Sequence, residues 1–251
     1  MSSKKISKNI LSIFILLLSA ILCCWLYFVV QNRQVHKLVY FWDNTEKILQ
    51  LSKSNEILQS KLVVKNFEQE ADLDNDLLKE NYQLINKQLL ITEDDKILWQ
   101  SPADWQVDSF VLADADNDGV VDINLSVWKP GNFGTSQPFW VKENDMSIKN
   151  HFFVFNLVDN QVKALWQSSN LEKPNCEFLL ADIDNDQKND LVVIEGEYGD
   201  NASCQGKYLA IWKWNDWGFS NYWRSLPGEF ANLQIEANNK QNYITINSVS
   251  F

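Results

Sequence analysis

The sequence ADADNDGVVD, residues 113–122, decides the fold. Its acidic residues alternate with other residues, and its last acid opens an apolar pattern of the kind found in strands. Two further stretches share its first six positions apart from the third: ADLDND at residues 71–76 and ADIDND at residues 181–186. Repetition of one unit within a chain is typical of repeat folds, in which each copy forms the same supersecondary structure. We therefore expect a repeat protein.

The likeness between the copies extends beyond the acidic core. ILWQS at residues 97–101 precedes the second copy, and ALWQS at residues 164–168 precedes the third. YWRS at residues 222–225 resembles the Trp-x-Ser end of these segments and indicates a further copy. The loop of that copy, at residues 238–241, has lost its acids.

The segments between these marks have the periodicity of strands. Ile123, Leu125 and Val127 alternate along residues 122–128, and residues 191–194 form a continuous apolar run, as in a strand buried on both faces. Four strands per copy follow, which in the third copy are residues 178–181, 191–195, 208–213 and 219–224. The sequence thus predicts an all-β fold.

The acidic loops can be compared with known calcium geometry. Calcium binds about 6–8 oxygen ligands, and alternating acids in a tight loop can converge on one point. An EF-hand requires a Glu at position twelve, where the three copies have Gln83, Leu125 and Val193. The EF-hand is therefore excluded, and the acid that recurs is at position nine, directly before a strand.

The pattern D-x-D-x-D-G-x-x-D, followed by an apolar strand, resembles the FG-GAP or VCBS repeat. The resemblance covers residues 67–251, and WKPGNFG at residues 128–134 and WGF at residues 217–219 resemble uncharacterised membrane-anchored bacterial members of this class. It implies blades of a β-propeller, as in the head of integrin α chains, with calcium bound between two strands. It implies no single activity.

The resemblance implies calcium ligands in three loops. The loop closest to the pattern supplies Asp114, Asp116, Asp118, the Val120 carbonyl and Asp122. The next supplies Asp182, Asp184, Asp186, the Lys188 carbonyl and Asp190, and the most divergent supplies Asp72, Asp74, Asp76 and Glu80. Gly119 suits the sharp turn at position six, where Gln187 and Leu77 stand in the other loops. The alternative for each loop is an Asn/Asp-rich turn capped by its own side chains.

About four blades can be counted. They begin near Phe67, Phe110, Phe178 and Phe230. The last supplies only two strands, and the strand patterns at residues 38–42 and 48–51 would complete it and close a small propeller without open sheet edges. In the competing interpretation, residues 45–65 are helical, because their apolar residues allow a stripe on one face of a helix.

The N-terminal part has the pattern of a signal-anchor. Residues 10–30 carry no charge and would span about 30 Å as a helix, the thickness of a bilayer core. Lys4, Lys5 and Lys8 flank this run on its N-terminal side, against Arg33 and Lys37 on the other side, and this slight bias places residues 1–9 in the cytoplasm and the remainder outside the cell membrane. Residues 31–66 then form a juxtamembrane segment that contains the blade-closing strands. A cleaved signal peptide and a domain that faces the cytoplasm are the alternatives.

The placement of charged, cysteine and aromatic residues indicates which partners and which compartment suit the main domain. Five of the 22 basic side chains precede Asp43, whereas all 33 acidic ones lie at or after it, so the main domain should repel nucleic acid. Cys176 and Cys204 flank the third acidic loop and could form a disulfide in an oxidising compartment, or remain buried thiols. The aromatic residues Phe133, Phe139 and Trp140 lie in a Gly- and Pro-containing segment that could bind a sugar or protein partner, or fold into the core.

These features favour a membrane-anchored, extracytoplasmic calcium-binding module that interacts with a partner. The alternatives are a lectin for envelope polysaccharide, an enzyme that acts on such polymers and a purely structural scaffold. Catalysis has little support, since only His36 and His151 are present and no nucleophile elbow, P-loop or His-rich metal set occurs.

Overall fold

The computed structural model describes residues 18, 19, 22, 34–52, 61–63, 67–132, 142–143, 145–237 and 241–250. The chain divides into two compact units, of which Lys37–Ser248 contains nearly all the strands. Within the described part of the chain, no helix has the length and apolarity needed to cross a bilayer. The predicted anchor at residues 10–30 lies outside the described residues, apart from Leu18, Ser19 and Leu22.

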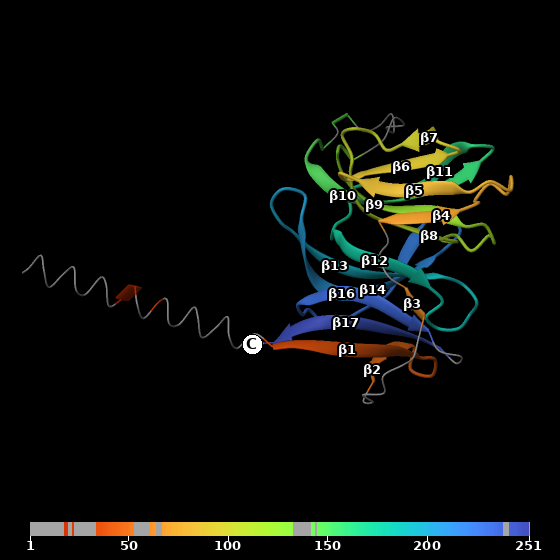
Figure 1. The fold of residues 1–251 in the computed structure, drawn as a ribbon. Helices are drawn as coiled ribbons and strands as arrows, with labels where there is room; N and C mark the ends of the chain where they lie inside the picture. Colours follow the sequence, from red (N-terminus) through yellow and green to blue (C-terminus); the bar gives the residue numbers. More distant parts are fainter. Residues whose placement is uncertain are drawn as a thin grey trace, which may run out of the picture. The chain divides into compact units, whose positions relative to one another are not determined.

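Three four-stranded antiparallel sheets follow one another along the chain (Figure 1). The first sheet contains β4 (Glu68–Ala71), β5 (Glu80–Ile85), β6 (Gln88–Glu93) and β7 (Lys96–Gln100). The second sheet contains β8 (Gln106–Ala113), β9 (Asp122–Pro130), β10 (Ile148–Val158) and β11 (Gln161–Gln167). The third sheet contains β12 (Asn175–Ala181), β13 (Asp190–Tyr198), β14 (Cys204–Trp214) and β15 (Phe219–Arg224). Each sheet pairs its strands in chain order, and each acidic loop joins the first strand of its sheet to the second.

The fourth sheet combines both ends of the described chain. Its strands are β1 (Gln34–Asp43), β2 (Ile48–Leu51), β3 (Lys61–Val63), β16 (Phe230–Ala237) and β17 (Asn242–Ser250). They pair in the order β2-β1-β17-β16-β3, so the N-terminal strands complete the C-terminal hairpin as the sequence predicts. The helical interpretation of residues 45–65 is wrong over β2 and β3. The all-β, propeller-like architecture with four sheets is thereby confirmed.

Three hydrophobic clusters hold neighbouring sheets together. One joins the first and second sheets through residues such as Tyr82 and Phe110, and another joins the second and third through Phe152 and Phe178. The last joins the third and fourth sheets, and includes Trp42. Figure 1 accordingly shows the third sheet between the second sheet and the fourth. Among the described residues, none of these clusters joins the fourth sheet directly to the first.

The second strands of the central sheets are buried on both faces. β13 is buried from Asp190 to Gly196, as its continuous apolar run predicts. In β9 the alternating polar residues are buried as well, and each has hydrogen-bond partners. The Asn124 amide donates to the Val111 and Ala113 carbonyls. The alternating strand predicted for residues 122–128 is therefore present and is buried on both faces.

Candidate cation-binding loops and an intersheet pocket

The three acidic loops share one hydrogen-bond frame. In the second loop (residues 114–122), the Ala115 N–H donates to the Asp122 carboxylate at 2.8 Å and the Gly119 N–H donates to Asp114 at 2.9 Å. The Val120 N–H donates to Asp118 at 2.8 Å. The same three bonds recur in the first loop (residues 72–80) and in the third loop (residues 182–190). The repeat seen in the sequence is thus a repeat of backbone geometry.

The loops turn through left-handed backbone conformations at two positions. Position six has φ +93° at Gly119, +67° at Gln187 and +77° at Leu77, in agreement with the preference for Gly there. Position four is also left-handed, with φ between +60° and +62° in all three loops. Asn occupies that position each time, and Asn tolerates this region better than most residues. Sequence reasoning missed the role of position four, although the invariant Asn of the three copies signals it.

Each frame brings carboxylates together. In the first loop, Asp72, Asp74, Asp76 and Glu80 each offer an oxygen, and these atoms lie within 4.8 Å of one another. The corresponding groups are Asp114, Asp116 and Asp122 in the second loop and Asp182, Asp184 and Asp190 in the third. Asp118 and Asp186, at position five, do not join these groups. All three groups have the residue types and spacing to hold a metal ion.

A residue on the third strand of each sheet faces the last acid of the loop. Asn81 pairs with Thr92, so the next step of the ladder places Glu80 opposite Glu93. By the same register, Ile123 and Phe155 bring Asp122 opposite Asn156. Leu191 and Trp212 bring Asp190 opposite Lys213. This position therefore carries a carboxylate in the first sheet, a neutral amide in the second and an ammonium in the third.

Lys213 binds the acids of the third loop. Its Nζ lies 2.8 Å from Asp184, 3.0 Å from Asp186 and 3.2 Å from Asp190. Burial alone would lower the pKa of Lys213, but these three carboxylates raise it. Burial raises the pKa of Asp190 to about 6, although the nearby ammonium opposes that shift. Lys213 thus pairs with two members of the converging group, Asp184 and Asp190, and with Asp186 beside it.

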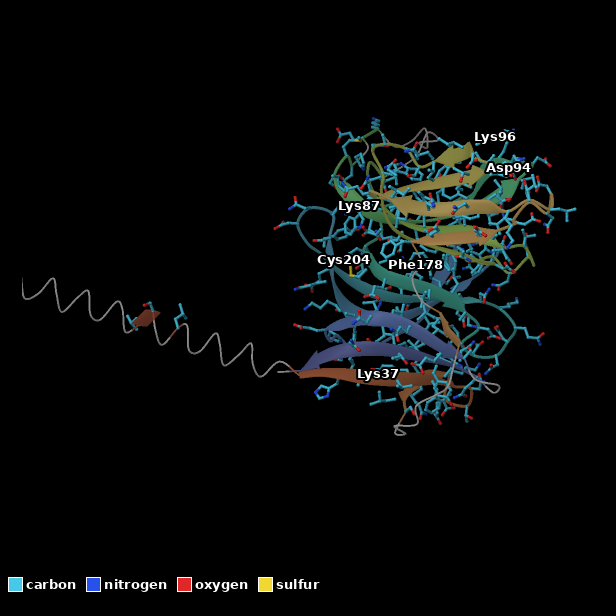
Figure 2. The ribbon with its side chains drawn as sticks, viewed as in Figure 1. Lys37, Lys87, Asp94, Lys96, Phe178 and Cys204 are labelled. Carbon is cyan, nitrogen blue, oxygen red and sulfur yellow. A yellow bond between two sulfur atoms is a disulfide. The ribbon has the colours of Figure 1, made fainter. Side chains whose placement is uncertain are left out.

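The first loop has no such partner among the described residues. Four buried carboxylate oxygens there accept no hydrogen bond: Asp72 Oδ1, Asp74 Oδ1, Glu80 Oε1 and Glu93 Oε2. Glu80 is fully buried and Glu93 is 9% exposed. Burial raises the pKa of both, and so does the charge of nearby loop acids. Asp94 and Lys96 mark the β6–β7 turn in Figure 2, directly after Glu93.

The second loop lies between the other two in how well its carboxylates are partnered. Both oxygens of Asp122 accept hydrogen bonds, one from the Ala115 N–H and one from the Asn156 amide at 2.7 Å. Burial raises the pKa of Asp122 to about 7, and the charges of Asp116 and Asp114 add to that shift. A cation would relieve this repulsion, but each oxygen of Asp122 already has a donor.

A pocket of about 250 Å³ lies between the second and third sheets. Its lining includes the aromatic rings of Phe152, Trp166, Trp212 and Phe219, with Arg224 among its polar groups. The buried carboxylate of Glu195 fixes two of these residues: it accepts from Arg224 Nε at 2.6 Å and from Trp212 Nε1 at 2.8 Å. Fixed aromatic faces beside oriented polar groups are typical of small-molecule sites. Sequence reasoning missed this pocket because its lining comes from separate repeats.

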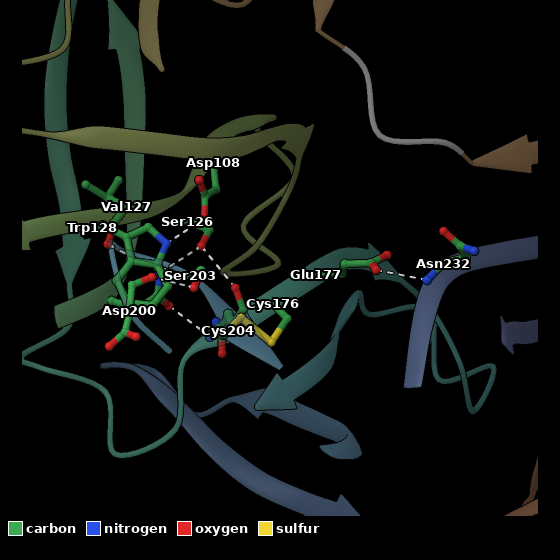
Figure 3. Close-up of a disulfide and its surroundings, with 12 residues drawn as sticks. Asp108, Ser126, Val127, Trp128, Cys176, Glu177, Asp200, Ser203, Cys204 and Asn232 are labelled. Carbon is green, nitrogen blue, oxygen red and sulfur yellow. Dashed lines mark hydrogen bonds between the residues drawn. A yellow bond between two sulfur atoms is a disulfide. The ribbon is translucent and has the colours of Figure 1, made fainter. Parts of the chain in front are cut away.

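The third sheet contains a disulfide (Figure 3). It joins Cys176 on β12 to Cys204 on β14, with Cα atoms 5.6 Å apart. Gly196 passes directly beside it, and a Cβ there would collide with the Cys176 Sγ and the Gln205 carbonyl oxygen. The predicted ligand-surface residues Phe133, Phe139 and Trp140 lie outside the described residues.

Comparison with known proteins adds no relative. No protein-family model matches the chain, and no curated protein sequence matches it. The fold and the loops therefore define the class of protein on their own. It is an all-β repeat protein whose sheets present Asp-rich loops that could hold metal ions.

Proposed function

We propose that this chain is a calcium-binding repeat domain of the FG-GAP or VCBS type that serves as an extracytoplasmic binding module. The observation that carries the proposal is the convergence of carboxylate oxygens within 4.8 Å in three loops of the same backbone frame. Carboxylates held so close repel one another unless a cation offsets their charge. Oxygen-only groups of this kind suit a hard cation such as calcium.

Calorimetry and thermal unfolding of the full-length chain test this proposal. Calcium chloride should bind with measurable heat and raise the melting temperature relative to excess chelator, because an ion that binds only the folded state stabilises it. Asp74→Asn should reduce both effects, whereas the matched control Asp200→Asn, in an exposed turn outside the loops, should leave them unchanged. An unchanged melting temperature with no heat of binding would show that the loops are acidic turns.

The extracytoplasmic location rests on two features. The uncharged run at residues 10–30 has the length of a membrane anchor, and a disulfide between Cys176 and Cys204 suits an oxidising compartment. Carbonate extraction of membranes should leave the chain in the pellet, and protease added to intact spheroplasts should digest its C-terminal domain. Release by carbonate would contradict the anchor, and protection from protease would place the domain in the cytoplasm.

A second candidate function is polysaccharide binding in the intersheet pocket. The volume of about 250 Å³ admits a single sugar ring, and Trp166 and Trp212 offer aromatic faces. The Arg224 guanidinium is oriented by Glu195 and would favour sugars that carry a carboxylate. This arrangement supports a lectin for acidic glycans.

Intrinsic tryptophan fluorescence tests the second candidate. Acidic oligosaccharides such as oligogalacturonate should change the emission of the wild-type chain, and Trp212→Phe should abolish most of that change. The control Trp217→Phe removes a tryptophan that is 80% exposed and does not line the pocket. An equal response in both variants would mean that the pocket is not the binding site.

A further inference from the structure

We infer that the residue opposite the last acid of each loop decides whether the loop takes a divalent cation, so that Glu93 makes the first loop the principal site and Lys213 makes the third loop independent of metal. This inference rests on the proposed cation binding and names the site that performs it. Similarity to the repeat pattern would rank the first loop as the weakest cation site, because it is the most divergent of the three. This inference ranks it as the strongest.

The first loop has an excess of negative charge that no described side chain neutralises. Its four loop acids face a fifth carboxylate from β6, that of Glu93, and no ion pair joins any of the five to a described Lys or Arg. Four oxygens of this set are buried without a hydrogen-bond donor. A buried carboxylate oxygen without a donor is costly, and a divalent cation can satisfy several such oxygens at once.

Glu93 is independent of the loop motif. It lies at the end of β6, where burial alternates along the strand and Leu89, Ile91 and Glu93 face inward. A charged residue at a buried position of a strand is unusual unless it is paired or binds a metal. Its unpartnered Oε2, brought beside the loop by the β5–β6 register, lies outside the group of four converging loop oxygens and therefore points to a supporting acid at the edge of the same cation site.

In the third loop, the ammonium group of Lys213 takes the place of a metal cation. Lys213 Nζ lies within 3.2 Å of carboxylate oxygens from three of the four loop acids, and none of those four acids has a buried oxygen without a donor. A divalent ion would have to displace this ammonium and leave it near a second positive charge. The Asn156 amide occupies the equivalent place in the second loop without a charge, which leaves that loop as the weaker site.

Counting bound ions in the full-length chain tests the inference. Native mass spectrometry and calorimetry with calcium chloride give the stoichiometry and the affinity of each site. The tightest site should weaken roughly 10- to 100-fold in Glu93→Gln, and should be lost in Glu93→Lys, which places an ammonium where Lys213 stands in the third sheet. Lys213→Gln should add one bound ion, because it frees the acids of the third loop. Asp184→Asn should leave the wild-type stoichiometry unchanged.

The outcomes separate this inference from the proposed function. If calcium binds tightly but Glu93→Lys retains the tightest site, or if Asp184→Asn removes an ion from the otherwise wild-type chain, the inference is wrong and the cation-binding function stands. If no ion binds to any form, both are wrong. Circular dichroism of each variant establishes that it is folded, and the near-isosteric Glu93→Gln keeps the test valid if Glu93→Lys does not fold.

Discussion

The side-chain amide of Asn117 pairs with the backbone of Asn189 as a neighbouring strand would. Asn117 Oδ1 accepts from the Asn189 N–H at 2.6 Å, and Asn117 Nδ2 donates to the Asn189 carbonyl at 3.3 Å. The Asn189 side chain returns a bond to the Asp114 carbonyl at 2.8 Å. The second loop is thereby fastened to the third, so two acidic loops from different sheets support each other's shape.

Removal of the Asn117 amide should destabilise the domain. Asn117→Gly suits the left-handed backbone at φ +62° but leaves the Asn189 N–H without its partner, which should lower the free energy of unfolding by about 1–3 kcal/mol. Asn185→Gly is the matched control, because Asn185 has φ +61° in the third loop and no such bond to another sheet among the described residues. Urea unfolding of both variants gives the comparison, and equal losses would contradict a role for the amide.

The left-handed conformation of Leu77 offers a stabilising substitution. Leu77 has φ +77° and is 91% exposed, so its side chain contributes little packing to offset the backbone strain. Leu77→Gly should be more stable than Leu77→Ala by about 1 kcal/mol, since both remove the leucine side chain and only Gly removes the Cβ. Chemical denaturation in chelator isolates this effect from metal binding. Equal stability of the two variants would show that the turn is not strained.

The fold was largely predictable because each strand carries its own periodicity. The apolar run of β13 and the hairpin spacing around it gave the four strands of the third sheet, and the unassigned strands β1 and β2 had one incomplete sheet to join. β3 was missed, since Lys61–Val63 is a short strand without a turn signal before it. Its partner, β16, lies far along the chain, so only the tertiary structure could supply the pairing.

The acidic loops were predictable as local motifs, whereas the residues that distinguish them were not. Glu93, Asn156 and Lys213 lie on the strand next to the one that begins with the last acid of the loop, and their approach to that acid depends on ladder register. The alternation of apolar residues in Gln88–Glu93 does place Glu93 on the inward face, which was a usable signal. No comparable signal marked Lys213, because a lysine at the end of a strand usually faces solvent.

The Cys176–Cys204 disulfide should stabilise the third sheet. It closes a loop with a sequence separation of 28, for which the loss of chain entropy in the unfolded state corresponds to about 3–4 kcal/mol. The double variant Cys176→Ser, Cys204→Ser should lose that amount in urea unfolding. Reductant should destabilise the wild-type chain similarly and have no effect on the double variant. A wild-type chain that is insensitive to reductant and equal in stability to the variant would contradict this role.

His151 should make the domain sensitive to mild acid. Its ring is fully buried on β10, its Nδ1 lies 3.2 Å from the Ser168 carbonyl, and burial lowers its pKa from 6.5 to about 4. The unfolded chain therefore takes up a proton below pH 6.5 that the folded chain refuses, so stability falls as the pH drops toward 4. The loss from this one residue is on the order of 2 kcal/mol between pH 7 and pH 5.

The variant His151→Asn isolates that contribution. Asn cannot titrate in this range and keeps an N–H donor near the Ser168 carbonyl. The raised pKa of Asp122, about 7, has the opposite effect on stability. The folded chain takes up that proton at a higher pH than the unfolded chain does, so it gains stability as the pH falls. The informative quantity is therefore the difference between wild type and variant, measured by urea unfolding in chelator at pH 7 and pH 5. Between pH 7 and pH 5 the wild type should lose stability relative to His151→Asn. A constant difference in the free energy of unfolding would mean that His151 is not held neutral by burial.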